Sequence, residues 1–262
     1  YISRDLEAGG RVAARWVPGK MLAAIATLGL GGSAGLEGPS IYMGSSIGSY
    51  CARRLKTLGF TDEDLRRLMV AGAAAGISAV FKAPLTGVVF ALEVPYRDDL
   101  AREALVPALV ASVTSYLVLV QFLGVEPLFS VAQRFTLDAR SLLDSVLLGL
   151  LIGLSARIFA SAYHAVRSRV RRHPAPFWVK TSVGGLVTGL VGLVALEVLG
   201  TPAVLGVGYG GIQSLMSGEY AAGQALVLFL LKAVATIATL GSGAAGGIFI
   251  PMIFLGASLG AF

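Results

Sequence analysis

The sequence predicts an all-helical integral membrane protein with short, interrupted helices. Of its 262 residues, 55% are hydrophobic and 14% are charged, and the mean hydropathy is +0.78. Soluble domains carry about 25% charged residues, and a soluble fold of this size would not bury so much apolar surface. The 34 glycines fit the same class, because small residues let membrane helices approach closely.

A series of hydrophobic segments runs along the chain, and each is predicted to be a helix. Many are shorter than the ~20 residues that a straight span needs, and several are interrupted by Gly or Pro. Such segments are typical of discontinuous helices whose ends meet near the midplane of a transporter. The segments are 20–36, 38–51, 67–81, 84–94, 104–123, 142–163, 177–200, 222–240 and 248–262.

Two of these helices have recognisable ends. Thr61 followed by Asp62 and Glu63 has the pattern of an N-cap and an acidic first turn. The stretch "RRHPAPFW" (171–178) predicts a connection in which proline stops one helix before the next begins.

The charge of the loops predicts how the chain is oriented in a cell membrane. The net charge of +6 lies largely in short loops, which fits the excess of basic residues on the cytoplasmic side and argues against a nucleic-acid partner. The loop 124–141 is nearly balanced and is predicted to lie on the opposite side. The basic or mixed loops, predicted to be cytoplasmic, are 11–20, 52–68, 96–102 and 167–173.

Two stretches of the chain share one pattern. "GLEGPSIYMGSSIG" (35–48) and "GIFIPMIFLGASLG" (247–260) align without a gap, with Gly and Pro at matching positions and Ser46 opposite Ser258. Chance in a Gly-rich chain is one explanation. The other is a structural duplication of the kind found in inverted-repeat transporters, with residues 1–123 left from the first repeat and 142–262 belonging to the second.

Both stretches predict a helix that begins inside the membrane. Pro is tolerated in the first turn of a helix, and Gly lets the backbone approach a ligand closely. A helix N-terminus offers unpaired N–H groups and about half a positive charge, which makes it an anion site. Glu37 lies at one such place, so its carboxylate would compete with a mobile anion and act as a gate.

At these residues the chain resembles the CLC family of chloride channels and chloride/proton exchangers. "GLEGP" (35–39) and "GIFIP" (247–251) are similar to two family signatures, and 72–94 is similar to the segment between them. We identify the chain as a fragment of a prokaryotic-type member. The resemblance implies a homodimer with one anion pathway per subunit, and it places a serine motif before Tyr1 and a pore tyrosine after Phe262.

The resemblance also implies the residues of the anion site. Glu37 would be the gating glutamate, and the Phe249 ring would line the path. The backbone amides of Gly38, Ile248 and Phe249 would face bound chloride. Exchangers commonly carry a proton-relay glutamate where this chain has Val94, which cannot bind a proton; the adjacent Glu93 matches a different family residue.

The subunit interface of the family corresponds to segments 84–94 and 104–123. Small residues in the second segment, Ala108, Ala111 and Ser112, are predicted to allow close helix packing. Lys180 and Lys232 are predicted to lie near helix ends with their ammonium groups at the interface. Lys82 is predicted to be an interfacial lysine at a helix break, or a lure for anions.

The sequence therefore predicts passive chloride conduction gated by Glu37, with proton-coupled exchange as the alternative. Nitrate, bromide and fluoride also fit such a site. Outside transport, the pattern "GSSIG" (44–48) would suit an intramembrane hydrolase using Ser46, and a non-conducting sensor is a third class. We expect no enzymatic activity, no cofactor and no metal centre, because the chain has two His and one Cys.

Overall fold

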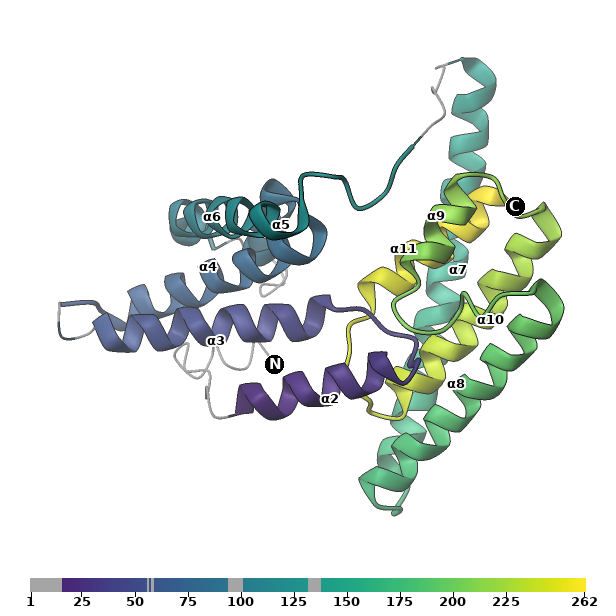
Figure 1. Ribbon diagram of the computed structural model, residues 1–262, viewed down its shortest axis with the longest axis horizontal. Helices are drawn as coiled ribbons and strands as arrows, with labels where there is room; N and C mark the ends of the chain where they lie inside the picture. Colours follow the sequence, from purple (N-terminus) through teal and green to yellow (C-terminus); the bar gives the residue numbers. More distant parts are fainter. Residues whose placement is uncertain (1–15, 56, 58, 94–100, 132–137) are drawn as a thin grey trace. The chain divides into compact units, whose positions relative to one another are not determined.

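The computed structural model describes residues 16–55, 57, 59–93, 101–131 and 138–262 (Figure 1). These residues are helical, and the β pairing found among them is one isolated bridge between Gly35 and Gly247. They form two compact units: one contains Leu36–Leu128 and the start of the first described helix as far as Leu22, and the other contains Ala23–Gly35 and Phe129–Phe262.

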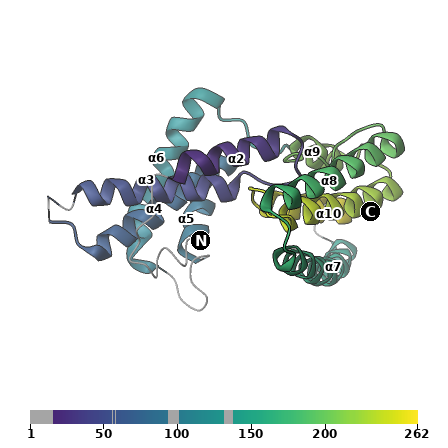
Figure 2. The same ribbon diagram turned by 90° about the horizontal axis from the view of Figure 1, so that it is seen from below.

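The first unit is built around two helices that touch along glycines. These two helices, α3 and α4, lie side by side (Figures 1 and 2). A Cβ added to Gly44 would lie 2.0 Å from the Gly72 carbonyl oxygen. A Cβ added to Gly72 would likewise lie 2.0 Å from the Gly44 carbonyl oxygen. The bounds are α2 Val17–Gly29, shared with the second unit, then α3 Glu37–Leu55, α4 Asp62–Phe81, α5 Pro84–Glu93, η3 Arg102–Ala104 and α6 Leu105–Leu123.

The start of α4 confirms the predicted N-cap. The Thr61 side chain accepts a hydrogen bond from the Asp64 N–H, and the Asp64 carboxylate accepts one from the Thr61 N–H at 2.9 Å. This reciprocal capping box satisfies two backbone donors at the helix end. The hydrogen bonds from the backbone and side chain of Thr61 hold the pKa of Asp64 below its ordinary value.

The other end of α4 shows what Lys82 does. Its backbone is left-handed, with φ +50°, and its ammonium donates to the carbonyl oxygens of Leu123, Gly124 and Glu126 at 3.0 to 3.3 Å. Those carbonyls close the C-terminus of α6, where a cation is favoured. Lys82 lies at the predicted helix break, and its contacts are those of a cap.

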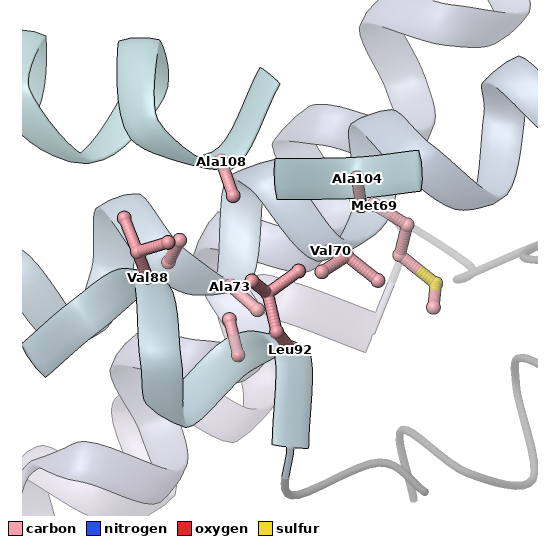
Figure 3. Packing of buried hydrophobic residues seen from close by; sticks show 9 residues of the cluster. Met69, Val70, Ala73, Val88, Leu92, Ala104 and Ala108 are labelled. Carbon is pink, nitrogen blue, oxygen red and sulfur yellow. The ribbon is translucent and has the colours of Figure 1, made fainter. Parts of the chain in front are cut away.

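The core of this unit lies where α4, α5 and α6 meet (Figure 3). Ala108 and Ser112 are fully buried here, so two of the three small residues predicted to pack between subunits pack inside this unit instead. Helical periodicity explains the difference, because Ala108 and Ser112 are four residues apart and lie on one face of α6, below its N-cap residue Ala104. The core residues are Met69, Val70, Ala73, Ala74, Val88, Ala91, Leu92, Ala104 and Ala108.

The second unit contains α10 as its central helix. It contacts α7, α8 and α11, and α11 also packs on α9. Figures 1 and 2 show α8 and α10 running side by side. The bounds are α7 Ala139–Arg172, α8 Phe177–Leu199, α9 Tyr209–Met216, α10 Ala222–Gly241 and α11 Phe249–Ala261, together with the end of α2 and the segment that follows it.

Several helix ends differ from the prediction. The helix α3 extends to Leu55 and the helix α4 begins at Asp62, so parts of the predicted loop 52–68 are helical. The helix α7 continues to Arg172. The basic stretch 167–173, predicted as a loop, is therefore helical except for its last residue, His173. Arginine is a good helix former and is favoured in a last turn. The helix ends at Arg172, with His173 as its C-cap just before Pro174, as predicted. The helix α2 ends at Gly29, before the positive φ of Gly31, and α9 was not predicted at all.

Four of the described helices are long and apolar enough to cross a membrane. The others are shorter or less apolar, which agrees with the prediction of interrupted segments. The four are Arg102–Leu123, Ser141–Arg172, Phe177–Leu199 and Ala222–Gly241.

Candidate anion-binding site

The two glycine-rich motifs meet at a reciprocal backbone bridge. The Gly35 N–H donates to the Gly247 oxygen at 2.7 Å, and the Gly247 N–H donates to the Gly35 oxygen at 2.8 Å. Each glycine lies two residues before a helix, α3 beginning at Glu37 and α11 at Phe249. The bridge therefore holds together the two backbone segments from which these helices start.

The similarity between the two segments extends further than the sequence analysis found. The ungapped alignment of the two motifs also pairs "ATLGLG" (26–31) with "ATLGSG" (238–243). The fourth residue of each stretch ends a helix, Gly29 in α2 and Gly241 in α10. Both stretches end in a glycine with positive φ, +87° at Gly31 and +101° at Gly243. Each copy is thus a helix end, a turn, a bridge residue and a helix start.

The backbone amides predicted to bind anions lie at the N-terminal ends of α3 and α11. The first intrahelical bond of α3 runs from Ser40 N–H to the Leu36 oxygen, and that of α11 runs from Met252 N–H to the Ile248 oxygen, both 3.1 Å. The N–H groups of the first helical turn point along the helix axis toward its N-terminus, where the helix dipole has its positive end. The predicted amides are those of Gly38, Ile248 and Phe249.

Glu37 is a buried acidic residue at a helix start. Its side chain is 4% exposed, and it is the first residue of α3. A carboxylate is favoured at this end of a helix, where a mobile anion would also be favoured. Ile248 and Phe249 are each 37% exposed and belong to the other unit, together with Gly247.

Two further residues singled out by the sequence are Val94 and Ser46. Val94, the predicted relay position, lies outside the described residues; its neighbour Glu93 is the last residue of α5 and is exposed. Ser46 lies inside α3, buried, and donates to the Tyr42 oxygen at 2.7 Å. A hydrolase nucleophile of this pattern needs a strand-to-helix turn, and the middle of a helix does not provide one.

Lys232 is a site that the sequence analysis placed wrongly. It lies in the middle of α10, fully buried, and not near a helix end. Its ammonium donates to the carbonyl oxygens of Val204 and Gly206 at 3.0 and 3.2 Å and lies 5.0 Å from the centre of the Phe254 ring. A lysine at the centre of an apolar run was the available signal, because an ammonium there needs oxygen partners.

Comparison with known proteins identifies the family to which the chain belongs. The family model for the voltage-gated chloride channels matches residues 3–262. The chain is 29% identical over 261 residues to a putative chloride channel protein ClcB-like of Ralstonia nicotianae, covering 99% of this chain and 59% of that protein. It is 33% identical over 255 residues to the H⁺/Cl⁻ exchange transporter ClcA of Yersinia pestis, covering 94% and 52%.

Two solved structures resemble the chain with a TM-score of 0.78 and 27% identity. One is a CLC-type fluoride/proton antiporter, with 99% of this chain and 65% of that one covered, and the other is a slow cyanobacterial Cl⁻/H⁺ antiporter, with 92% and 55% covered. The chain spans a little over half the length of the curated relatives named above. The predicted all-helical fold class is thereby confirmed, and the chain belongs to the CLC family of voltage-gated chloride channels and exchangers.

Proposed function

We propose that this chain forms part of a chloride transporter of the cell membrane in which chloride is exchanged for protons. The observation that carries the proposal is the Gly35–Gly247 bridge, which joins the segments leading to two helix starts, one of them occupied by Glu37. Two helix N-termini on one anion supply charge and N–H donors without a fixed cation. Chloride would bind at the amides of Gly38, Ile248 and Phe249.

In this mechanism Glu37 alternates between two states. Ionised, its carboxylate occupies the positive end of α3 and excludes chloride. Protonated or displaced, it leaves that position to the anion, so one residue handles both ions. The antiparallel pairing of equivalent glycines supports two inverted repeats, because residues related by a two-fold axis contact each other reciprocally.

Exchange is preferred to the passive conduction that the sequence favoured. The relatives that support it are the exchange transporter of Yersinia pestis and the two antiporter structures. Passive conduction remains the second candidate, because Val94 stands where an exchanger commonly has a titratable relay and because one relative carries the name of a putative channel. In the exchanger, protons would have to reach Glu37 along a chain of water molecules, because Val94 cannot bind a proton.

The assembly and orientation are part of the same proposal. Val106 and Val110 of α6, with Val89 of α5, are exposed apolar residues on the helices that the family uses for its homodimer. The C-termini of α3 and α7 carry the basic residues expected on the cytoplasmic side.

Chloride efflux tests the transport claim. The full-length protein would be reconstituted in liposomes loaded with chloride, and a chloride electrode would follow efflux after an ionophore relieves the membrane potential. We expect rapid efflux that depends on the protein. Efflux no faster than from empty liposomes would reject transport and favour a non-conducting sensor.

A further inference from the structure

A cluster of buried hydroxyl groups lies within the second unit, which also contains the Gly35–Gly247 bridge. Its members come from the segment after α2, from α8, and from α10 and the turn that follows it. All are at most 6% exposed, and a hydroxyl buried so deeply must be hydrogen-bonded. This hydroxyl cluster consists of Ser33, Thr188, Thr236, Thr239 and Ser242.

The direction of its hydrogen bonds follows from the number of protons. Thr188 Oγ1 lies 2.9 Å from the Gly184 oxygen and 3.3 Å from the Ala235 oxygen, and since carbonyls only accept, its single proton goes to one of them. Thr239 Oγ1 lies 2.8 Å from Thr188 Oγ1, and donation from Thr239 to Thr188 gives each of the two hydroxyl protons an acceptor. A lone pair of Thr239 is then directed to the Ser33 N–H, which donates to it at 3.1 Å.

Thr239 therefore contacts both of the segments that precede the two helix starts. Through its side chain it holds the backbone of Ser33, two residues before Gly35. Through its carbonyl it accepts a bond from Ser242 Oγ at 2.7 Å, on the segment that leads to Gly247. A second contact, Ser33 Oγ with Thr236 Oγ1 at 2.9 Å, comes from the preceding turn of α10.

The equivalent residue of the other copy has no such role. Thr27 occupies the position of Thr239 in the repeated "ATLG" stretch, and its hydroxyl donates to the Ala23 oxygen of its own helix at 2.8 Å. Thr27 is only half-buried, whereas Thr239 is 3% exposed. The Thr27 carbonyl does accept a bond from the Gly32 N–H at 2.8 Å, so the two threonines differ in their hydroxyls: that of Thr239 connects two segments, and that of Thr27 closes a turn of its own helix.

We propose that Thr239 is a positioning residue for anion binding. Its hydroxyl fixes the backbone of Ser33–Gly35 against α10, and this segment leads directly to Glu37 and the first amides of α3. Without the hydroxyl, the Ser33 N–H would be buried without an acceptor, and the segment would move to regain one. This inference rests on the proposed function, because it assumes that anions bind at the helix starts.

The test compares two substitutions in the full-length protein in liposomes. Thr239→Val keeps the shape of the side chain and removes its acceptor, whereas Thr239→Ser keeps the acceptor. We expect Thr239→Val to raise the chloride concentration for half-maximal flux about fivefold or more, the equivalent of one lost buried hydrogen bond. The ratio of nitrate to chloride flux should change as well. Thr239→Ser and the matched control Thr27→Val should behave like the wild type in both measurements.

Each outcome decides a different point. Equal chloride affinity and equal nitrate-to-chloride ratio in Thr239→Val and Thr239→Ser would overturn the positioning role. Absence of chloride flux in the wild type would overturn the proposed function instead. If Thr239→Val does not yield folded protein, Thr239→Ala replaces it with the same expected shift. Failure of both to fold, with a normal serine variant, would make Thr239 a folding residue and contradict the proposal.

Discussion

Gly35 and Gly247, far apart in the sequence, exchange both of their backbone hydrogen bonds, at 2.7 and 2.8 Å. Each precedes a helix by two residues, so the pair sets where α3 and α11 begin. The bridge explains why two motifs of the same spacing occur in one chain: each copy needs the other to satisfy its backbone.

Removing the carboxylate of Glu37 is expected to abolish gating. With Glu37→Gln, the side chain no longer changes charge, so chloride flux in liposomes should not vary between acidic and neutral external pH. Flux of the wild type should vary with pH, because protonation removes the competing negative charge. A mutant whose flux keeps the pH dependence of the wild type would show that another group is the gate.

Adding one methyl group between α3 and α4 is expected to destabilise the first unit. Gly44→Ala would place a Cβ 2.0 Å from the Gly72 oxygen, and backbone cannot yield as a flexible side chain would. The expected cost is about 1–3 kcal/mol, the usual range for overpacking. Thermal unfolding in detergent, followed by size-exclusion chromatography, would measure it.

The matched control for that substitution is Gly149→Ala in α7. Nothing lies within 4 Å of a Cβ at this position, and Ala is the better helix former. Its melting temperature should equal or exceed that of the wild type. An equal loss of stability in both variants would mean that the contact between α3 and α4 is not responsible.

Neutralising Lys232 is expected to loosen the loop between α8 and α9. Lys232→Met would leave the carbonyls of Val204 and Gly206 without their donor, at a cost of about 1–3 kcal/mol. Amide hydrogen exchange should increase between residues 200 and 208. Lys180→Met, near the start of α8 where the side chain is half-buried, should leave that exchange unchanged. No difference between the two variants would rule out the anchoring role of Lys232.

The exposed face of α6 is expected to form the homodimer. Val110→Trp, at a residue that is 61% exposed, should shift the protein toward monomers on dilution in mild detergent while chloride efflux persists. Leu150→Trp, on a residue of α7 that is 69% exposed, is the control and should leave the dimer intact. Equal dimer stability in both would place the interface elsewhere.

Local rules were enough to predict most of the helices and the N-cap of α4. Apolar runs marked most of the helices, Thr61 marked the start of α4, and Pro174 marked the end of α7. The two motifs likewise placed helix starts at 38 and 248, each within one residue of the observed starts at Glu37 and Phe249. In each case the determining residues are close together in the sequence, so the pattern itself carries the information.

Contacts between segments far apart in the sequence could not be predicted from local patterns. Lys232 is buried because the carbonyls of Val204 and Gly206 surround its ammonium, and nothing in its own helix indicates them. Thr239 differs from Thr27 only through its neighbours, since the two stand in identical local sequence. The short helix α9 begins in the glycine-rich "GVGYGG", where composition favours a loop.

The measurement that tests the account most directly is the reversal potential of the full-length protein at a fixed chloride gradient while the pH gradient is varied. Exchange predicts that the reversal potential moves with the pH gradient, and that a chloride gradient alone drives protons uphill at a constant ratio. A reversal potential that follows the chloride gradient and ignores pH would contradict coupling. It would make this protein a passive chloride channel, as Val94 at the relay position predicts.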